Sequence, residues 1–385
     1  MTLLVVAGLA FGLVALAWIV YPLAMWTRTP RTASGAGPSR EPTDRVVVVV
    51  ATRDAPDLVV ARVRNLLSAD YPAALLRVVV AIDCASPFPV EAYRDALGSL
   101  AEVVPGDPSG GKAANLNAGV RAAAGADVIV FADVGQEFSE GAISHMVATL
   151  QDDRFGGVAG RYTQRLDDPV MAGFARLEVV IRAGQAEGHS VVSTSGSIYA
   201  IRASLWKELP PGLICDDLFT TLSIIQQGRR VGFNHEAVAF DPRSFTRDTQ
   251  FARRVRTLTG LIQYCTLEPR VLVPWSNPVW THFVFHKVLR LLTPIPVFVG
   301  LVALLTWLVL NAPQLLVMLA TGAALIALIG RIFAPGLFRK LAGQLAWILR
   351  LQLVPGLAIF NGIRRRWTVW TPTPQGNGGR AGAEA

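Results

Sequence analysis

Two long stretches without a charged residue, 2–27 and 291–330, constrain the fold of this chain more than any other feature. A helix that crosses a lipid bilayer needs about 20 predominantly apolar residues. The first stretch is long enough for one such helix, and the second is long enough for two. The sequence therefore predicts a multi-pass membrane protein with a polar part between its apolar ends.

The N-terminal stretch, 1–27, is interpreted as a retained transmembrane anchor. A cleaved signal peptide would carry a basic leader and a small-residue cleavage site, but only two residues precede the apolar run. Aromatic residues towards its far end, such as Trp18 and Trp26, suit a membrane interface. Arginines follow directly, beginning with Arg28, so the positive-inside rule places the next part of the chain in the cytoplasm.

The formal net charge of +8 suggests an anionic partner. No motif combines aromatic and basic residues as nucleic-acid-binding proteins do, so we expect membrane lipids and no nucleic acid as partners. The three cysteines, Cys84, Cys215 and Cys265, lack metal-ligand spacing. Reduced thiols in the cytoplasm are their expected state.

Between the apolar ends, residues 45–265 are typical of a cytoplasmic α/β domain, and a Pro-, Gly- and Ser-rich linker at 28–44 joins it to the anchor. Continuous apolar runs, which indicate strands buried on both faces, alternate with runs at helical spacing. The expected strands are 45–52, 78–83, 102–104 and 127–133, and the expected helices are 57–69, 90–100 and 112–124. This alternation predicts a mostly parallel sheet.

The C-terminal part is expected to return to the membrane. Residues 266–290 are rich in Trp and Phe and predict an interfacial helix. Residues 291–330 predict a transmembrane hairpin that turns near Asn311. The segment 341–363 contains an arginine and a proline, so a full span and a re-entrant segment are both open. The tail 371–385 is expected to be disordered.

Two acidic residues lie at the C-terminal ends of predicted strands, at the edge where ligands of open α/β sheets bind. Asp83 suits hydrogen bonds from a base or a ribose, although such a residue is often only part of a turn. Asp133 suits a hard divalent cation, which would neutralise a departing diphosphate. Gly110 and Gly111 precede a helix that begins near Lys112. Backbone N–H groups and a lysine at a helix N-terminus can hold a diphosphate.

Two further groups lie in the second half of the domain. Asp216 and Asp217 are adjacent carboxylates that repel each other, so one can have a raised pKa and act as a base. The alternative is an ordinary acidic helix N-terminus. Arg253 and Arg256 lie one helical turn apart, where they could face a phosphate or a lipid headgroup.

In their order and spacing, these features resemble the family 2 glycosyltransferases, the inverting group that includes cellulose, chitin and hyaluronan synthases. The resemblance extends from the N-terminal anchor to the C-terminal helices and implies a GT-A fold, which is a Rossmann-like α/β fold. Gly111-Lys112 with Asn117, for example, resembles the Gly-Lys-x-x-x-Leu-Asn segment of the family. The implied nucleotide-sugar-binding residues are Thr52, Asp54, Asp83, Lys112, Asn117 and Asp133, and Asp133 is also the implied ligand of Mg²⁺ or Mn²⁺.

The same resemblance implies roles for residues in the second half of the domain. Cys215-Asp216-Asp217 stands where Thr-Glu-Asp is usual, which makes Asp217, with Asp216 beside it, the implied catalytic base. The segment 253–257 stands where Gln-x-x-Arg-Trp is usual. It implies a diphosphate or acceptor site that contains Arg253, Arg254 and Arg256.

Two departures from the family pattern bear on the function. Gly135 replaces the second metal-binding aspartate, and Thr257 replaces the tryptophan. The expected function is transfer of a sugar with inversion, from a nucleotide sugar, with a uridine diphosphate sugar favoured, to a polysaccharide or lipid acceptor at the cell (inner) membrane. The alternative is a catalytically degenerate scaffold for another polysaccharide synthase. A transporter is disfavoured because a large polar domain interrupts the helices and the helices show no inverted repeat.

Overall fold

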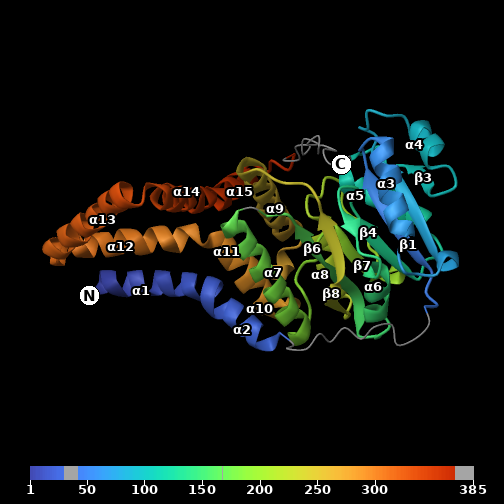
Figure 1. The fold of residues 1–385 in the computed structure, drawn as a ribbon. Coiled ribbons are helices and arrows are strands. Elements are labelled where there is room, and N and C mark those ends of the chain that lie inside the picture. The colour runs from blue at the N-terminus through green and yellow to red at the C-terminus, as the bar shows by residue number, and fades with distance from the viewer. Residues whose placement is uncertain (30–41, 167, 369–385) are drawn as a thin grey trace.

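The computed structural model describes residues 1–29, 42–166 and 168–368. One eight-stranded sheet with the strand order β3-β2-β1-β4-β7-β6-β8-β5 forms its centre (Figure 1). The strands are β1 (Val46–Thr52), β2 (Leu76–Ile82), β3 (Glu102–Pro105), β4 (Val128–Ala132), β5 (Glu137–Phe138), β6 (Phe155–Gln164), β7 (Ile198–Arg202) and β8 (Arg230–Asp241). β1 runs parallel to β2 and β4, and β2 runs parallel to β3, whereas β7 is antiparallel to both of its neighbours. The prediction of a mostly parallel α/β sheet is confirmed.

The valine run of β1 shows why a continuous apolar segment forms this strand. Val47 and Val49 pack into the core on one face of the sheet, and Val46, Val48 and Val50 pack into the core on the other. Successive side chains of a strand point to opposite faces, so a strand covered on both sides needs apolar residues throughout. Each of the five is at most 2% exposed, and burial of each contributes about 1.5–3 kcal/mol.

Helices cover both faces of the sheet, and those of the first half match the predicted ranges with ends shifted by at most three residues. The helices on the Val48 face are α3 (Pro56–Leu67), α4 (Val90–Leu97) and α6 (Ala142–Leu150), and those on the Val49 face include α5 (Gly111–Ala122), α8 (Asp216–Gln226) and α9 (Arg247–Leu267). Two short 3-10 turns are η2 (Ala73–Leu75) and η3 (Ala203–Leu205). A further long helix, α7 (Pro169–Gly188), packs against β8.

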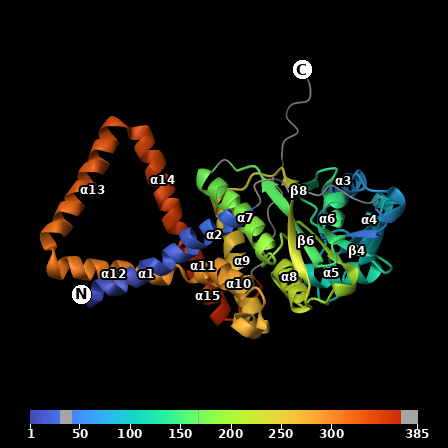
Figure 2. The ribbon, with the colours of Figure 1, turned by 90° about the horizontal axis from the view of Figure 1, so that it is seen from below.

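Within the described ranges, four helices are long and apolar enough to cross a membrane. They are Thr2–Arg28, made of α1 (Thr2–Ala15), η1 (Leu16–Val20) and α2 (Tyr21–Arg28), then α12 (Pro294–Asn311), α13 (Pro313–Phe333), and Pro335–Ile363, made of α14 (Pro335–Leu351) and α15 (Leu353–Ile363). All four extend from one end of the sheet domain (Figure 1). α1 packs along α12, but α13 diverges, so α12, α13 and α14 outline a triangle (Figure 2). The expected turn near Asn311 is present, but 291–330 does not form a closed antiparallel hairpin.

The region between the sheet domain and α12 is held on α7 rather than standing apart as an isolated helix. Its elements are η4 (Pro269–Leu272), η5 (Pro274–Ser276), α10 (Trp280–Phe283), η6 (Val284–Val288) and α11 (Leu289–Leu292). His286 Nε2 lies 3.0 Å from a carboxylate oxygen of Glu178 on α7, and Arg290 donates to Glu178 at 2.7 Å. Trp18 donates to Thr293 at 2.8 Å. These contacts fix the apolar helices to the domain.

The segment 341–363 bends rather than running as one straight span. The helix breaks at Gln352, and α15 packs against α9 of the sheet domain. Asn361 donates to Thr259 at 3.3 Å, and Arg350 pairs with Asp248 at 2.7 Å. The chain therefore returns to the sheet domain before residue 364. The predicted linker overlaps residues 30–41, which lie outside the described residues, as does the predicted disordered tail 371–385.

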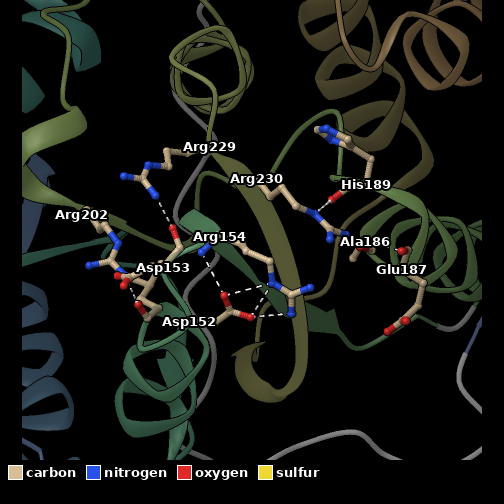
Figure 3. A network of polar contacts seen from close by, with 10 residues as sticks. Asp152, Asp153, Arg154, Ala186, Glu187, His189, Arg202, Arg229 and Arg230 are labelled. Atoms are coloured by element: carbon tan, nitrogen blue, oxygen red, sulfur yellow. Dashed lines mark hydrogen bonds and ion pairs between the residues drawn. The ribbon is translucent and has the colours of Figure 1, made fainter.

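A network of hydrogen bonds and ion pairs connects β7 and β8 to the turn after α6 and to the end of α7 (Figure 3). Arg202 of β7 donates to the Phe155 carbonyl at 2.9 Å and pairs with Asp153 at 3.1 Å. Arg230, at the start of β8, donates to the His189 carbonyl at the end of α7. These bonds tie two strands to two helix ends, and we assign them a structural role.

Candidate active site

The site lies at the carboxyl ends of three parallel strands. β1 ends at Thr52, β2 is followed by Asp83, and β4 is followed by Asp133. Because β1 lies between β2 and β4, these three ends meet at the same edge of the sheet. Thr52 Oγ1 accepts a hydrogen bond from the Asp54 backbone N–H at 2.9 Å, which shapes the turn after β1.

Asp83 fixes the glycine loop in front of α5. One carboxylate oxygen accepts hydrogen bonds from the Gly111 N–H at 3.0 Å and from Asn115 Nδ2 at 2.8 Å. Gly110 and Gly111 have φ angles of 67° and 82°, a region that favours glycine because a Cβ is strained there. The loop therefore delivers Lys112 to the first turn of α5 in a defined orientation.

Lys112 joins the two acidic positions that the sequence places far apart. Its Nζ lies 2.9 Å from Asp133 Oδ1 and 3.4 Å from Asp216 Oδ2. Ser197 donates to Asp133 Oδ2 at 3.2 Å. A Cβ at Gly196 would lie 3.2 Å from Lys112 Nζ, so the loop before β7 closes tightly over this ion pair. Ser197 is not among the site residues predicted from the sequence, and its hydrogen bond to Asp133 adds it to the site.

Burial and charge act in opposite directions on these groups. Burial disfavours the charged Lys112, but Asp133 and Asp216 together raise its pKa above the ordinary lysine value. Burial likewise disfavours ionised Asp133, yet Lys112 holds the pKa of that carboxyl below its usual range. Asp216 differs, because burial and the neighbouring Asp217 outweigh Lys112 and raise its pKa to about 6.

Replacing Asp216 by Asn is expected to stabilise the protein at pH 7.5 by about 1–3 kcal/mol. The native carboxyl has a higher pKa than the unfolded one, so the native state binds more protons between about pH 4 and 6. The free energy of unfolding contributed by this group therefore falls as the pH rises through that window. Thermal unfolding of Asp216→Asn should show its largest gain in Tm at pH 7.5 and a smaller gain at pH 4.5. The exposed Asp95→Asn is the control, and an equal gain at both pH values would contradict the assignment.

Asp216 and Asp217 open α8 with different surroundings. Asp216 is 5% exposed and faces Lys112, whereas Asp217 is only partly buried. The electrostatic neighbours of Asp217 include Lys112 and Lys287, the latter on η6 beside α7. Asp217 therefore lies between the strand ends and the region that leads to the apolar helices.

The three arginines of α9 diverge. Arg256 is close enough to Asp133 to lower the pKa of that carboxyl, so it faces the strand ends. Arg253 stacks over Phe245 with 4.4 Å from Cζ to the ring centroid. Arg254 faces α7 instead, with its Cζ 5.0 Å from the Phe174 ring centroid. The structure thus separates Arg254 from the other two.

The side chain of Asn117 does not contact the residues at the strand ends, Asp83 and Asp133. Its amide bridges the backbone of Leu209, donating to the carbonyl at 2.9 Å and accepting from the N–H at 2.9 Å. Asn115 contacts Asp83 in its place. The two asparagines are two residues apart on a helix and point in different directions, which the Gly-Lys segment alone did not distinguish.

The described residues do not supply the ligand set expected for Mg²⁺ or Mn²⁺ at Asp133. Lys112 and Ser197 contact one oxygen each of its carboxylate. Gly135 brings no side chain, and no group of three or more His, Cys, Asp or Glu side chains converges within the described ranges. A cation that binds through oxygen ligands would have to displace these contacts.

The α/β sheet, with its acidic strand ends and the lysine that joins them, defines a GT-A domain. The chain belongs to the family described as Glycosyltransferase like family 2, which matches residues 42–268. The predicted family and its enzyme class are confirmed.

Among the solved structures that this chain resembles, PcManGT has a TM-score that supports this fold. PcManGT, a mannosyltransferase from Pyrobaculum calidifontis solved in complex with GDP-Man and Mn²⁺, has a TM-score of 0.67 and 20% identity, over 94% of this chain and 99% of that chain. Glucosyl-3-phosphoglycerate synthase from Mycobacterium tuberculosis, solved with Mg²⁺ and UDP, has a TM-score of 0.43 and 18% identity, over 58% and 80%. S. aureus TarS 1-349, solved with UDP-GlcNAc, has a TM-score of 0.42 and 13% identity, over 66% and 87%. Comparison with curated proteins finds no match.

Proposed function

We propose that this protein is a membrane glycosyltransferase whose cytoplasmic domain moves a sugar from a nucleotide sugar to an acceptor held at the membrane. The observation that carries the proposal is the placement of Lys112 between Asp133 and Asp216 at the strand ends. A lysine in the first turn of a helix can bind a diphosphate there. Four helices of suitable length and composition among the described residues support the membrane assignment.

In the proposed reaction the acceptor hydroxyl attacks the anomeric carbon as the bond to the diphosphate breaks, so the anomeric configuration inverts. Asp217 takes the proton of that hydroxyl as general base. Lys112 and Arg256 stabilise the negative charge that develops on the leaving nucleoside diphosphate. Asp83 and the loop after β1 hold the nucleoside end of the donor.

A cationic cluster beside Asp217 supports an acceptor that carries phosphate. The cluster consists of Arg182, Arg254, Lys287 and Arg290, with Glu178 as its central acid. Buried guanidinium nitrogens on all three arginines (Nε of each, and Nη2 of Arg290) lack a hydrogen-bond partner among the described residues. Buried donors without partners cost free energy, so an anion that fills them is stabilised.

The position of the cationic cluster fits an acceptor that comes from the membrane. Arg290 stacks over the ring of Trp18, in the first apolar helix, with 4.4 Å from Cζ to the centroid. Burial lowers the pKa of Lys287, and Asp217 is among the acids that oppose this. The cluster thus extends from an apolar helix to the proposed base. We propose a phosphate-bearing membrane lipid as the acceptor, in preference to a free polysaccharide.

Arg182→Gln is expected to raise the KM for a phosphate-bearing lipid acceptor by about 10-fold, the effect of losing one charge-assisted contact. Donor binding should stay unchanged because Arg182 lies on the acceptor side. The matched control is Arg176→Gln, an exposed arginine on the same helix. Transfer assays in vesicles with an isoprenyl monophosphate, and with the corresponding alcohol, measure the difference. Equal KM values for both variants and the wild type would contradict the acceptor assignment.

The function is tested by following a labelled sugar from nucleotide sugars into products made by the protein in native membranes. Label in a solvent-extractable lipid supports single transfer, and label in an insoluble polymer supports a polysaccharide synthase. A scaffold subunit would give neither product when it is purified and reconstituted alone.

A further inference from the structure

The space beside Gly135 holds an arginine. A Cβ built on Gly135 would lie 2.3 Å from Cζ of Arg243 and 2.4 Å from each of its terminal nitrogens. The guanidinium therefore occupies the position from which a side chain at residue 135 would extend. This is the position at which the family pattern has its second metal-binding aspartate.

Arg243 is held in this place by a buried carboxylate. Its Nε donates to Asp241 Oδ1 at 2.9 Å and its Nη2 donates to Asp241 Oδ2 at 2.8 Å. Asp241 is fully buried and also accepts hydrogen bonds from Gln136 and Tyr162, each at 2.9 Å. A carboxylate with four such contacts cannot turn away, so it orients the guanidinium rigidly.

The rest of the guanidinium remains available. Its Nη1 makes no hydrogen bond to any residue that the structure describes, and the Arg243 side chain is 40% exposed. Asp133 is among the charges that act on Arg243, which places the guanidinium near the end of β4. Arg243 and Arg253 both lie over Phe245, at 5.5 Å and 4.4 Å from its centroid. The guanidinium of Arg243 thus occupies the space beside Gly135 where a second carboxylate would have to hold a metal, and Arg253 lies on the same ring as Arg243.

We propose that Arg243, together with Lys112, supplies the positive charge that binds the donor diphosphate, so that donor binding needs no divalent cation. This inference rests on the proposed function. A guanidinium fixed on one edge presents its other N–H groups in a planar fork that matches phosphate oxygens. Gly135 is then the residue that makes room for Arg243, rather than a sign of a lost site.

The test measures UDP and GDP binding to the detergent-solubilised protein by titration calorimetry, in EDTA and then with Mn²⁺. The wild type should bind one of the two nucleotides with a Kd that changes less than 3-fold between the conditions. Arg243→Gln should weaken binding at least 10-fold in EDTA. Arg243→Lys keeps a cation beside Asp241 and protects the fold, and it should give an intermediate Kd. Arg154→Gln, an exposed arginine paired with Asp152, is the control and should match the wild type.

A reciprocal variant sharpens the test. Gly135→Asp combined with Arg243→Ala replaces the guanidinium by a second carboxylate. The nucleotide Kd of this variant should then be at least 10-fold lower with Mn²⁺ than in EDTA. Wild-type binding that EDTA abolishes would overturn the inference while leaving the glycosyltransferase proposal intact. Absence of nucleotide binding with and without Mn²⁺ would instead count against the proposed function itself.

Discussion

Asp217→Asn is expected to lower kcat for sugar transfer by about 10²–10⁴-fold, the range that a positioned general base contributes. The amide has nearly the same shape as the carboxylate but cannot take the proton of the acceptor hydroxyl. Asp217 is partly exposed, and it acts on Lys112 of the proposed diphosphate site electrostatically rather than through an ion pair among the described residues. Nucleotide affinity should therefore change by less than about 3-fold, a shift below 1 kcal/mol. Single-turnover transfer and calorimetric titration separate the two effects.

The neighbouring carboxylate provides the comparison for that variant. Asp216 faces Lys112 and is almost fully buried, so Asp216→Asn should alter donor affinity as well as turnover. A normal turnover of Asp217→Asn together with an inactive Asp216→Asn would show that Asp216 is the base. Normal turnover of both variants would contradict general base catalysis by this pair.

Lys112→Met is expected to lower kcat/KM for the donor by about 10²–10³-fold, comparable to the loss of one preorganised donor at a developing negative charge. Removing the ammonium also leaves Asp133 and Asp216 without the cation that separates them. Their mutual repulsion should then raise both carboxyl pKa values, and the acid limb of the pH–rate profile should move to higher pH. Steady-state kinetics across pH 5 to 9 measure both effects.

Lys207→Met is the matched control, because Lys207 is an exposed lysine of the same domain. It should leave kcat/KM and the pH profile unchanged. If Lys112→Met lowers only the thermal stability and leaves kcat/KM intact, the lysine has a structural role and the proposed diphosphate site lies elsewhere.

The sequence was sufficient to predict the strands of the first half of the domain and the residues at their ends. A short apolar run rich in β-branched valine, such as that of β1, favours a strand buried on both faces, and polar residues that follow such parallel strands reach one edge of the sheet. The ion pairs of Lys112 with Asp133 and Asp216 connect residues that are far apart in the sequence. The resemblance to a family brought these residues into one site, whereas their spacing alone did not.

Other features depend on contacts that no local pattern records. Asn115 and Asn117 are equally polar, and only the packing of α5 against the loop at Leu209 distinguishes their partners. Arg243 follows no recognisable motif, since its position is set by the buried Asp241. The only signal in the sequence was the absence of a side chain at Gly135. The divergence of α13 from α12 likewise lies beyond what hydropathy predicts, because hydropathy measures length and not direction.

The most direct test of the central claim is release of nucleoside diphosphate from a panel of UDP and GDP sugars by the purified, detergent-solubilised protein. Wild type and Asp217→Asn are compared with a phosphate-bearing lipid acceptor present. The account predicts that at least one donor releases its nucleoside diphosphate with wild type and that Asp217→Asn releases it at least 100-fold more slowly, the lower limit for loss of a general base. Equal release by both proteins, or no release from any donor by a folded wild type, would contradict it.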